Sequence, residues 1–397
     1  MLRVPTSEIA ARIAAFQGLL ARGGLDAAVI RQNADLYYFT GTVQDAHLIV
    51  PASGRPVFLV RRDVGRAEEQ SPIRPVVPLR KMQDLAAALA EACGGGTPKR
   101  IGMELDVLPA NAFFTYDENI FAKQEIVDAG GYIRLVRAVK SPWEIEMMRR
   151  AAICSRAVAD AVPEILRAGI TERELSVELE TAARRAGHMG LLRLRTFNME
   201  MYFGHILSGP DAAVPSYGNT ATGGMGVSPA FAQGASDRRI GMDEMVSVDT
   251  MLNRDGYLND QTRNFAVGTP PARLLDAYRF SREIHERFKA EARPGSIAGE
   301  LYDRVMGWVE KAGWTDSFMG FGDSRISFVG HGLGIEVDEY PFIARGQDLV
   351  IEEGMIVAFE PKLILPGVGL AGLENTYVVT REGLESLNTA AEELITV

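Results

Sequence analysis

Apolar side chains near the start of the chain recur with the spacing of a helix. Between Ser7 and Gly23 they occupy every third or fourth position, at Ile9, Ile13, Phe16 and Leu20. Residues at this spacing share one helix face, and paired glycines end helices, so the pattern predicts a helix over 7–23. Short apolar runs then alternate with helical patterns along the next hundred residues, at 27–30, 56–60, 85–92 and 100–103. This alternation predicts an α/β N-terminal domain.

A helix start marks the end of this domain. Ser141-Pro142-Trp143-Glu144 puts a capping residue before a proline and an acidic first turn. We therefore expect two domains, residues 1–138 and 139–397. In the second, helical patterns at 169–187 and 295–313 each follow a longer helical pattern and precede a β-rich stretch. This repetition predicts an α+β domain of two similar halves around a pseudo-twofold axis.

Two acidic residues flank a turn sequence in the first half of the second domain. Asp249 and Asp260 lie on either side of Asn-Arg-Asp-Gly at 253–256. A hairpin centred between Arg254 and Asp255 would set the two carboxylates directly opposite each other on neighbouring strands. The first half therefore offers one facing acidic pair.

The second half offers another acidic pair and an imidazole. Glu360 and Glu374 flank Pro366-Gly367, and a hairpin centred on Gly367 would set them opposite each other. Like charges that face each other on a sheet are destabilising, and buried carboxylates need partners, so this arrangement requires cations. His331, in the glycine-rich segment 330–334, would add a nitrogen ligand. Four carboxylates and one imidazole suit two divalent ions that activate water, with Mn as the first candidate and Co, Zn or Fe as others.

Composition narrows the partners of such a site. The 397 residues include 42 Lys and Arg against 52 Asp and Glu, a net charge of −10 that disfavours nucleic acid and anionic membranes. Two cysteines do not make a disulfide framework, which fits a reducing compartment. The first residues lack the apolar core of a signal peptide, and no stretch approaches the roughly 18 apolar residues that span a bilayer. We therefore expect a cytoplasmic protein with neither nucleic-acid nor membrane partners.

The acidic and histidine motifs resemble the metallopeptidases of the pita-bread fold, the family of methionine aminopeptidase, aminopeptidase P, prolidase and creatinase. The segments that carry this resemblance are Asp249 with 256–257, 260–265, 330–334, 359–361 and 373–376. The N-terminal segments 24–30 and 35–41, together with 137–145, are similar to the creatinase and prolidase branch. The resemblance covers nearly the whole chain. It implies a proline-directed dipeptidase or aminopeptidase that works as a homodimer.

The resemblance also implies a role for each ligand. Asp249 would bind one metal ion, and Asp260 and Glu374 would bridge both. His331 and Glu360 would bind the other ion, and Glu360 would also transfer protons as a catalytic carboxylate.

Three positions depart from the family pattern. Ser216 stands where the peptidases carry a substrate-binding histidine after a Ser-Gly-Pro segment. Asp338 replaces a second such histidine, and Gly372 replaces a basic residue that is common in proline-specific members. Such histidines hold the scissile carbonyl, which an anionic aspartate cannot do, so Asp338 would act instead as a general base or bind a cationic group.

Further candidates come from the sequence around these positions. His205 lies close enough to the Ser-Gly-Pro segment to serve as a replacement proton shuttle, although a structural histidine is the alternative. Arg195 alternates with Arg193 on an expected strand and would meet a substrate carboxylate, unless it is simply solvated or ion-paired. We place Arg195, Ser216 and Tyr340 among the substrate-binding candidates. The remaining histidines lack motif context and are expected at the surface or as helix caps: His47, His188 and His285.

Three functions fit these residues. The first is hydrolysis of small Xaa-Pro peptides by a hydroxide bridging two metal ions, with Glu360 moving protons. The second is a lyase or an amidinohydrolase that acts on a small zwitterion with Asp338 as base. The third is a binding protein without catalytic activity, which the matched metal ligands disfavour.

Overall fold

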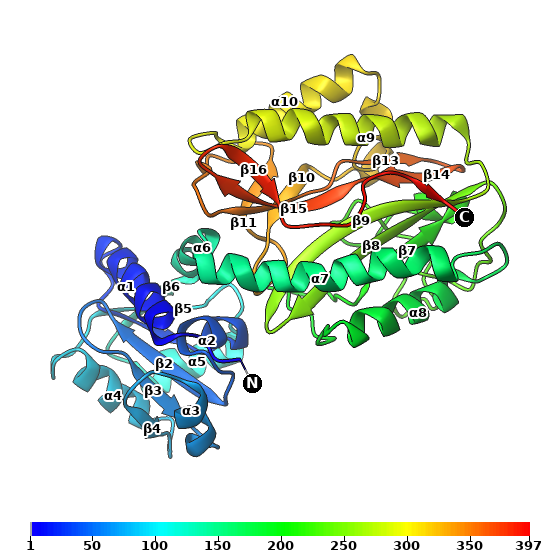
Figure 1. Cartoon of the computed structure of the whole chain (residues 1–397). Helices are drawn as coiled ribbons and strands as arrows, with labels where there is room; N and C mark the ends of the chain where they lie inside the picture. The colour runs from blue at the N-terminus through cyan, green and yellow to red at the C-terminus, as the bar shows by residue number, and fades with distance from the viewer. Residues whose placement is uncertain (1) are drawn as a thin grey trace. The chain divides into compact units, whose positions relative to one another are not determined.

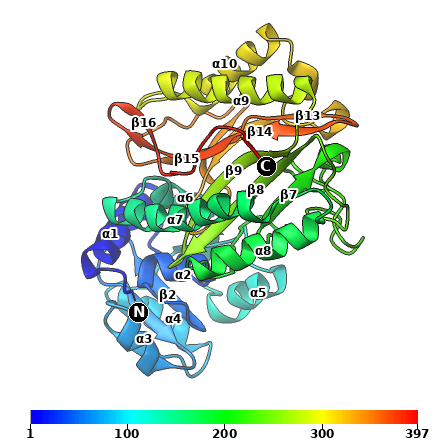
Figure 2. The same cartoon turned by 45° about the vertical axis from the view of Figure 1, so that its right-hand side comes forward.

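A computed structural model describes residues 2–397, which divide into two compact units. The N-terminal unit runs to Arg137 and includes 195–197, whereas the C-terminal unit comprises 138–194 and 198–397. The N-terminal unit therefore ends one residue before the position expected from the sequence. Figure 1 and Figure 2 show the elements of each unit from two directions.

The N-terminal unit is a mixed six-stranded sheet with helices, as the alternating pattern predicted. The strand order is β4-β3-β2-β1-β5-β6, in which β2 alone runs antiparallel to its neighbours in the described chain. The strands are β1 (Ala27–Ile30), β2 (Ala46–Pro51), β3 (Val57–Val60), β4 (Val76–Pro78), β5 (Arg100–Met103) and β6 (Glu125–Asp128). The helices are α1 (Thr6–Arg22), α2 (Asn33–Thr40), α3 (Val64–Gln70), α4 (Asp84–Ala92), α5 (Ala110–Thr115) and α6 (Gly130–Ala138).

The C-terminal unit is built on a nine-stranded sheet. Its main path runs β11-β10-β12-β15-β9-β8-β7, with β16 paired to β15 and β17 to β9, and a separate hairpin joins β13 and β14. The strands of the first half are β7 (Gly204–Ser208), β8 (Glu244–Arg254) and β9 (Tyr257–Val267). Those of the second are β10 (Phe328–Gly332), β11 (Glu339–Ala344), β12 (Ile356–Phe359), β13 (Lys362–Leu365), β14 (Gly369–Gly372), β15 (Glu374–Thr380), β16 (Gly383–Ser386) and β17 (Ile395–Thr396).

Each half of this sheet has its own helix pair and its own apolar core. Helices α7 (Pro142–Ile165) and α8 (Glu172–Arg185) pack with β7, β8 and β9, whereas α9 (Ala272–Glu291) and α10 (Ala298–Lys311) pack with the strands of the second half. Figures 1 and 2 both show one helix pair along each half of the sheet. The two similar halves expected from the repeated pattern are therefore present, and they leave the strands between them to position a site.

The helix starts follow the sequence. Ser141 and Thr171 each accept a hydrogen bond from the backbone N–H three residues on, and Glu144 and Glu174 complete both capping boxes. These boxes satisfy N–H groups that the first turn of a helix leaves unpaired.

The expectation for the three histidines without motif context is wrong for His47 and His285. His188 is buried, but its backbone N–H donates to the Ala183 oxygen at 3.0 Å and so caps the end of α8. His47, His188 and His285 are 2%, 5% and 1% exposed. Each ring has a polar partner inside the protein in place of water. His47 Nε2 lies 2.6 Å from the Tyr116 hydroxyl, and His188 Nδ1 accepts a hydrogen bond from the Asn253 N–H. Burial lowers the pKa of both His47 and His285 to about 3, so these rings are neutral core residues.

Candidate metal centre

The first acidic pair lies on the β8–β9 hairpin, but in a different register from the one expected. Asp249 pairs with Thr262, and Asp260 pairs with Met251. The central turn residues are Asp255 and Gly256, with φ of 55° and 94°. Two positive φ angles define the hairpin turn that Asp-Gly favours, so the turn is centred one residue later than predicted. Because the shift between the strands is two residues, Asp249 and Asp260 become diagonal neighbours on the same face.

The second acidic pair follows the predicted register. Phe359 pairs with Asn375 on one side, and Lys362 pairs with Gly372 on the other. This register sets Glu360 across from Glu374, as a hairpin centred on Gly367 requires. Each half of the sheet therefore brings two carboxylates to the same region.

A single pocket of the C-terminal unit collects most of the predicted site. It is lined by Met199, Glu200, Met201, Tyr202, Gly204, His205, Asn219, Thr220, Thr222, Gln233, Asp249, Met251, Asp260, Phe328, His331, Val337, Asp338, Glu360, Lys362 and Glu374. The lining includes the five expected metal ligands and both catalytic candidates outside that set, His205 and Asp338. Methionine and aromatic side chains form part of the wall.

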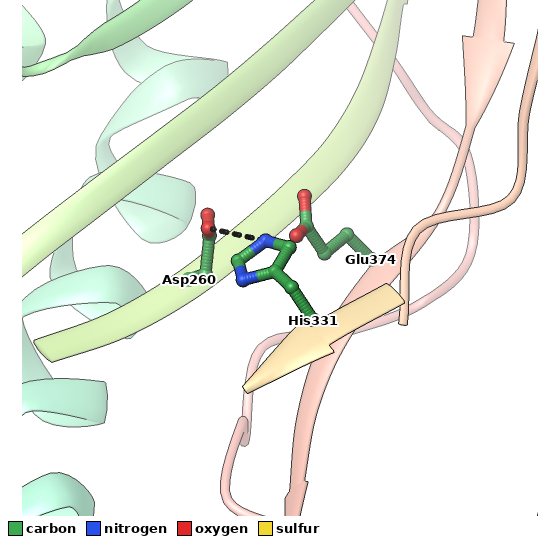
Figure 3. Close-up of side chains that lie close together, drawn as sticks. All are labelled: Asp260, His331 and Glu374. Atoms are coloured by element: carbon green, nitrogen blue, oxygen red, sulfur yellow. Dashed lines mark ion pairs between the residues drawn. The ribbon is translucent and has the colours of Figure 1, made fainter. Parts of the chain in front are cut away.

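Three of the expected ligands converge closely. Asp260, His331 and Glu374 each offer one ligand atom, and these atoms lie within 4.8 Å of one another (Figure 3). All three side chains are buried. His331 Nε2 lies 3.9 Å from Asp260 Oδ2 and 3.8 Å from Glu360 Oε1. Ligand atoms about 2.1 Å from one ion are about 3 to 4 Å apart, so an ion fits between them.

The orientation of His331 suits this role. Its Nδ1 lies 3.0 Å from the backbone oxygen of Gly332, which can only accept, so Nδ1 carries the proton of the neutral ring. Burial opposes the charged ring, but the charges of Asp338, Glu360 and Glu374 outweigh it and raise the pKa of His331. In the neutral ring the lone pair is on Nε2, which faces Asp260 and Glu360. Asp338 Oδ1 also lies 3.6 Å from Nδ1 and adds a negative charge behind the ring. A carboxylate or carbonyl in this position fixes the tautomer of a metal-binding histidine.

A lysine that the sequence analysis missed enters the same cluster. Lys362 Nζ lies 2.7 Å from Glu360 Oε2, 2.8 Å from Asp249 Oδ2 and 3.3 Å from Glu374 Oε2. The residue is 2% exposed. Burial alone would lower the pKa of Lys362, but these three carboxylates outweigh it and raise the pKa well above its ordinary value. The side chain is therefore a buried ammonium.

The carboxylates still carry more negative charge than Lys362 neutralises. Burial and the charges of Glu374 and Asp249 raise the pKa of Asp260 well above its ordinary value. Burial raises the pKa of Glu374 to about 7, with Glu360 and Asp249 adding to the effect and Lys362 opposing it. A carboxylate that resists ionisation in this way is stabilised by a further cation, because the cation removes the repulsion.

The donor set therefore fits one divalent ion held by Asp260, His331 and Glu374, with Glu360 Oε1 within reach. It does not fit a second ion at Asp249 as the side chains stand, because the ammonium of Lys362 contacts Asp249 directly. The resemblance implies two divalent metal ions, and the side chains fit an ion at one of these two positions.

Further side chains hold the ligands in place. Thr262 donates a hydrogen bond to Glu374 Oε2 at 2.7 Å. Arg263, which is 2% exposed, donates to the backbone oxygen of Glu374 and to Asn375 Oδ1, both at 2.8 Å. His285 lies between the Tyr377 hydroxyl and the backbone oxygen of Leu373, 2.9 Å from each, and so anchors the start of β15. These contacts restrict the movement of Glu374.

His205 stands next to Asp249 across the β7–β8 pair. Its Nδ1 lies 2.7 Å from Thr222 Oγ1, which donates to Asp249 Oδ2 at 3.3 Å. Burial lowers the pKa of His205 to about 4, although Asp249 opposes this. The ring is therefore neutral at pH 7 and lies within the pocket, which keeps the proton-shuttle prediction open.

The structure does not bring the three substrate-binding candidates into the pocket lining. Arg195 belongs to the N-terminal unit, where it pairs with Asp35 at 2.7 Å and with both oxygens of Asp106. Ser216 donates to Gln233 Oε1 at 2.8 Å, and the Tyr340 ring packs edge-on against Phe342. Asp338 is in the lining, with a φ of 60°.

A simple signal for Lys362 was present in the sequence. Side chains two residues apart on a strand share a face, so Lys362 follows Glu360 onto the ligand face. Gly372 stands in the same relation to Glu374, and the register sets it directly across from Lys362. Alternation along the strand would therefore have placed the lysine in the cluster.

Comparisons with known proteins agree with this geometry. Residues 146–381 match Metallopeptidase family M24, and residues 12–139 match the Creatinase/Prolidase N-terminal domain. The chain is 26% identical over 377 residues to the Xaa-Pro dipeptidase of Pyrococcus furiosus, across 94% of this chain and 95% of that protein. It is 28% identical over 398 aligned positions to a probable dipeptidase PepE of Mycobacterium tuberculosis, across 98% and 96%. Its fold is similar to that of the Xaa-Pro dipeptidase from Bacillus anthracis, with a TM-score of 0.82, 24% identity and coverage of 98% and 100%.

The M24 match spans the carboxylates, the histidine and the strands β7 to β15 that hold them. In residues 2–397, no helix is both long and apolar enough to cross a membrane. The family expected from the motifs is therefore confirmed on both the sequence and the fold: the chain belongs to metallopeptidase family M24 and carries the N-terminal domain of its creatinase and prolidase members.

Proposed function

We propose that this protein hydrolyses short Xaa-Pro peptides in a metal-dependent reaction. The observation that carries the proposal is the convergence of Asp260, His331 and Glu374 in the pocket of an M24 domain. Relatives named Xaa-Pro dipeptidase, aligned over more than nine-tenths of both chains, support the substrate class. A divalent ion held by these three residues would polarise the scissile carbonyl and activate water.

Glu360 is positioned to move the protons of this reaction. Hydrolysis adds hydroxide to the acyl carbon, and the proton removed from water must reach the departing amine nitrogen. Glu360 Oε1 faces His331, and Oε2 is held by the Lys362 ammonium at 2.7 Å. A fixed carboxylate next to the ligands can accept a proton from water and return it to the amine.

The pocket walls support a small, partly apolar substrate. Met199, Met251 and Phe328 line the pocket beside the ligands. Apolar walls with a few convergent polar groups are typical of small-molecule sites, and a proline ring presents an apolar surface to such walls. The neutral ring of His205 would meet the polar part of the substrate.

The test uses protein stripped of metal with a chelator and then supplied with Mn, Co or Zn. Xaa-Pro dipeptides and tripeptides are incubated with each form, and the free amino acids are separated and quantified. Cleavage that appears only with added metal is the expected result. Cleavage of none of these peptides by metal-loaded protein would refute the proposal.

The alternative reaction, a lyase or amidinohydrolase acting on a small zwitterion, rests on Asp338. This carboxylate lines the pocket, at the position where the resemblance implies a histidine in the peptidases. The same carboxylate lies 3.6 Å from His331 Nδ1, a position suited to orienting the ring rather than to removing a proton from substrate. We therefore favour the peptidase reaction.

Oligomeric state and location complete the proposal. We propose a homodimer in the cytoplasm, which light scattering and fractionation would test.

A further inference from the structure

Lys362 makes direct contact with three residues that bind ions in the family pattern. Its Nζ is within 2.8 Å of one oxygen each of Asp249 and Glu360, and 3.3 Å from Glu374 Oε2. At these distances the ammonium hydrogens point at the carboxylates, and no ion fits between them. The side chain belongs to the cluster and does not extend into solvent.

The opposite strand provides room for this lysine. Gly372 pairs with Lys362, and a Cβ on Gly372 would lie 2.7 Å from Lys362 Cγ. A larger residue there would displace the lysine stem from the cluster. The position at which the family pattern implies a basic residue is thus a glycine, and the positive charge comes from the facing residue of the same hairpin.

The remaining ligands form a group without Asp249. Asp260, His331 and Glu374 converge within 4.8 Å, whereas Asp249 Oδ2 is held by Lys362 and by the Thr222 hydroxyl. Glu360 divides its oxygens between the two sides, with Oε2 on Lys362 and Oε1 3.8 Å from His331 Nε2. The carboxylate cluster therefore has one side held by an ammonium and another side open to an ion.

We propose that Lys362 replaces one of the two metal ions of the family's centre, so that this protein binds a single divalent ion through Asp260, His331 and Glu374. An ammonium and a divalent ion cannot share the Asp249 position, because both are cations and both require the same oxygens. This inference rests on the metal site of the proposed function but not on its peptide substrate.

The test is the number of Mn²⁺ ions bound per chain. Protein stripped by chelator is titrated with Mn²⁺ in a calorimeter, and the metal content of the desalted protein is measured by mass spectrometry. Wild type should bind one equivalent. Lys362→Met, which keeps the length of the stem but removes the charge, should bind two. Lys311→Met, a change at an exposed lysine of α10, is the matched control and should stay at one.

The double variant Lys362→Met/Asp249→Asn identifies the second position. It should return to one equivalent, because Asp249 would be a ligand of the restored site. Electron paramagnetic resonance of wild type loaded with Mn²⁺ gives a reading that needs no variant. An isolated ion gives a six-line spectrum, whereas a coupled pair of ions would overturn the inference.

The outcomes separate this inference from the proposed function. Two equivalents in wild type would overturn the inference, and peptide cleavage by that protein would leave the proposed function intact. One equivalent in Lys362→Met would show that the lysine does not displace an ion. One ion in wild type without cleavage of any Xaa-Pro peptide would support the inference and refute the proposed function. No bound ion would overturn both.

Discussion

Glu172 offers a quantitative test of how a buried carboxylate stabilises the strands beside the pocket. It lies in the first turn of α8 and is 0% exposed. One oxygen accepts hydrogen bonds from the N–H and hydroxyl of Ser208, at 2.7 and 2.8 Å. The other accepts from the N–H and hydroxyl of Ser236, at 3.0 and 2.8 Å. Glu172 thereby ties the end of β7, which carries His205, to the segment around Ser236.

The Glu172→Ala substitution removes all four bonds. The serine hydroxyls can turn to other partners, as Ser208 Oγ already accepts from Arg238, but the two backbone N–H groups stay buried without acceptors. Each such group costs about 1–3 kcal/mol, so the two together cost about 2–6 kcal/mol, and the cavity adds to this loss. Glu172→Gln keeps one acceptor oxygen and leaves one backbone N–H without an acceptor. The free energy of unfolding should therefore fall by about 1–3 kcal/mol.

Urea unfolding followed by tryptophan fluorescence measures this loss of stability in the C-terminal unit, which contains Glu172. The three tryptophans all lie in the C-terminal unit: Trp143, Trp308 and Trp314. Glu178→Gln, at an exposed position of α8, is the control and should leave the midpoint unchanged. Burial raises the pKa of Glu172, so ionising it has a cost that opposes the four bonds. A Glu172→Gln variant as stable as wild type would show that the cost of ionising Glu172 equals what its hydrogen bonds contribute. This result would refute the reasoning.

Three further predictions concern the metal centre and the buried histidines. His331→Ala should abolish the stabilisation by Mn²⁺, about 2.7 kcal/mol at a hundredfold excess over Kd, which in wild type is measured as a rise in melting temperature. An unchanged rise would exclude His331 as a ligand. Asp338→Asn should weaken Mn²⁺ binding by about 10–100-fold in a competition titration, because Asp338 orients His331. Lost turnover at unchanged affinity would instead favour Asp338 as a base. His285 has a folded pKa of about 3 against about 6.5 when unfolded, so its contribution is present above pH 6.5 and lost as the pH falls toward 3. In His285→Gln, the free energy of unfolding from urea titrations should therefore fall less between pH 6.5 and 4.5 than in wild type, by up to about 1.4 kcal/mol per pH unit. Equal slopes would contradict this.

Much of the candidate site follows from local patterns. The strand-turn-strand sequence around Gly367 was sufficient to place Glu360 across from Glu374, and the capping boxes at Ser141 and Thr171 were sufficient to start two helices. The motifs around His331 identified the family before any geometry was known. Such features depend on residues close together in the chain, or on a turn type that short segments encode.

The sequence alone therefore determined the fold family and the two-halved domain, and it named the acidic and histidine side chains that converge in the pocket. The tertiary structure decided which of these side chains contact the ammonium of Lys362. Whether Lys362 extends into the cluster depends on the space above Gly372 and on carboxylates from β8, β12–β13 and β15. Burial of His285 likewise depends on Tyr377 and Leu373, about ninety residues away. Hydrophobic and polar patterns report which face of an element is buried, but the balance of charge in a site is a sum over residues that only the folded chain brings together.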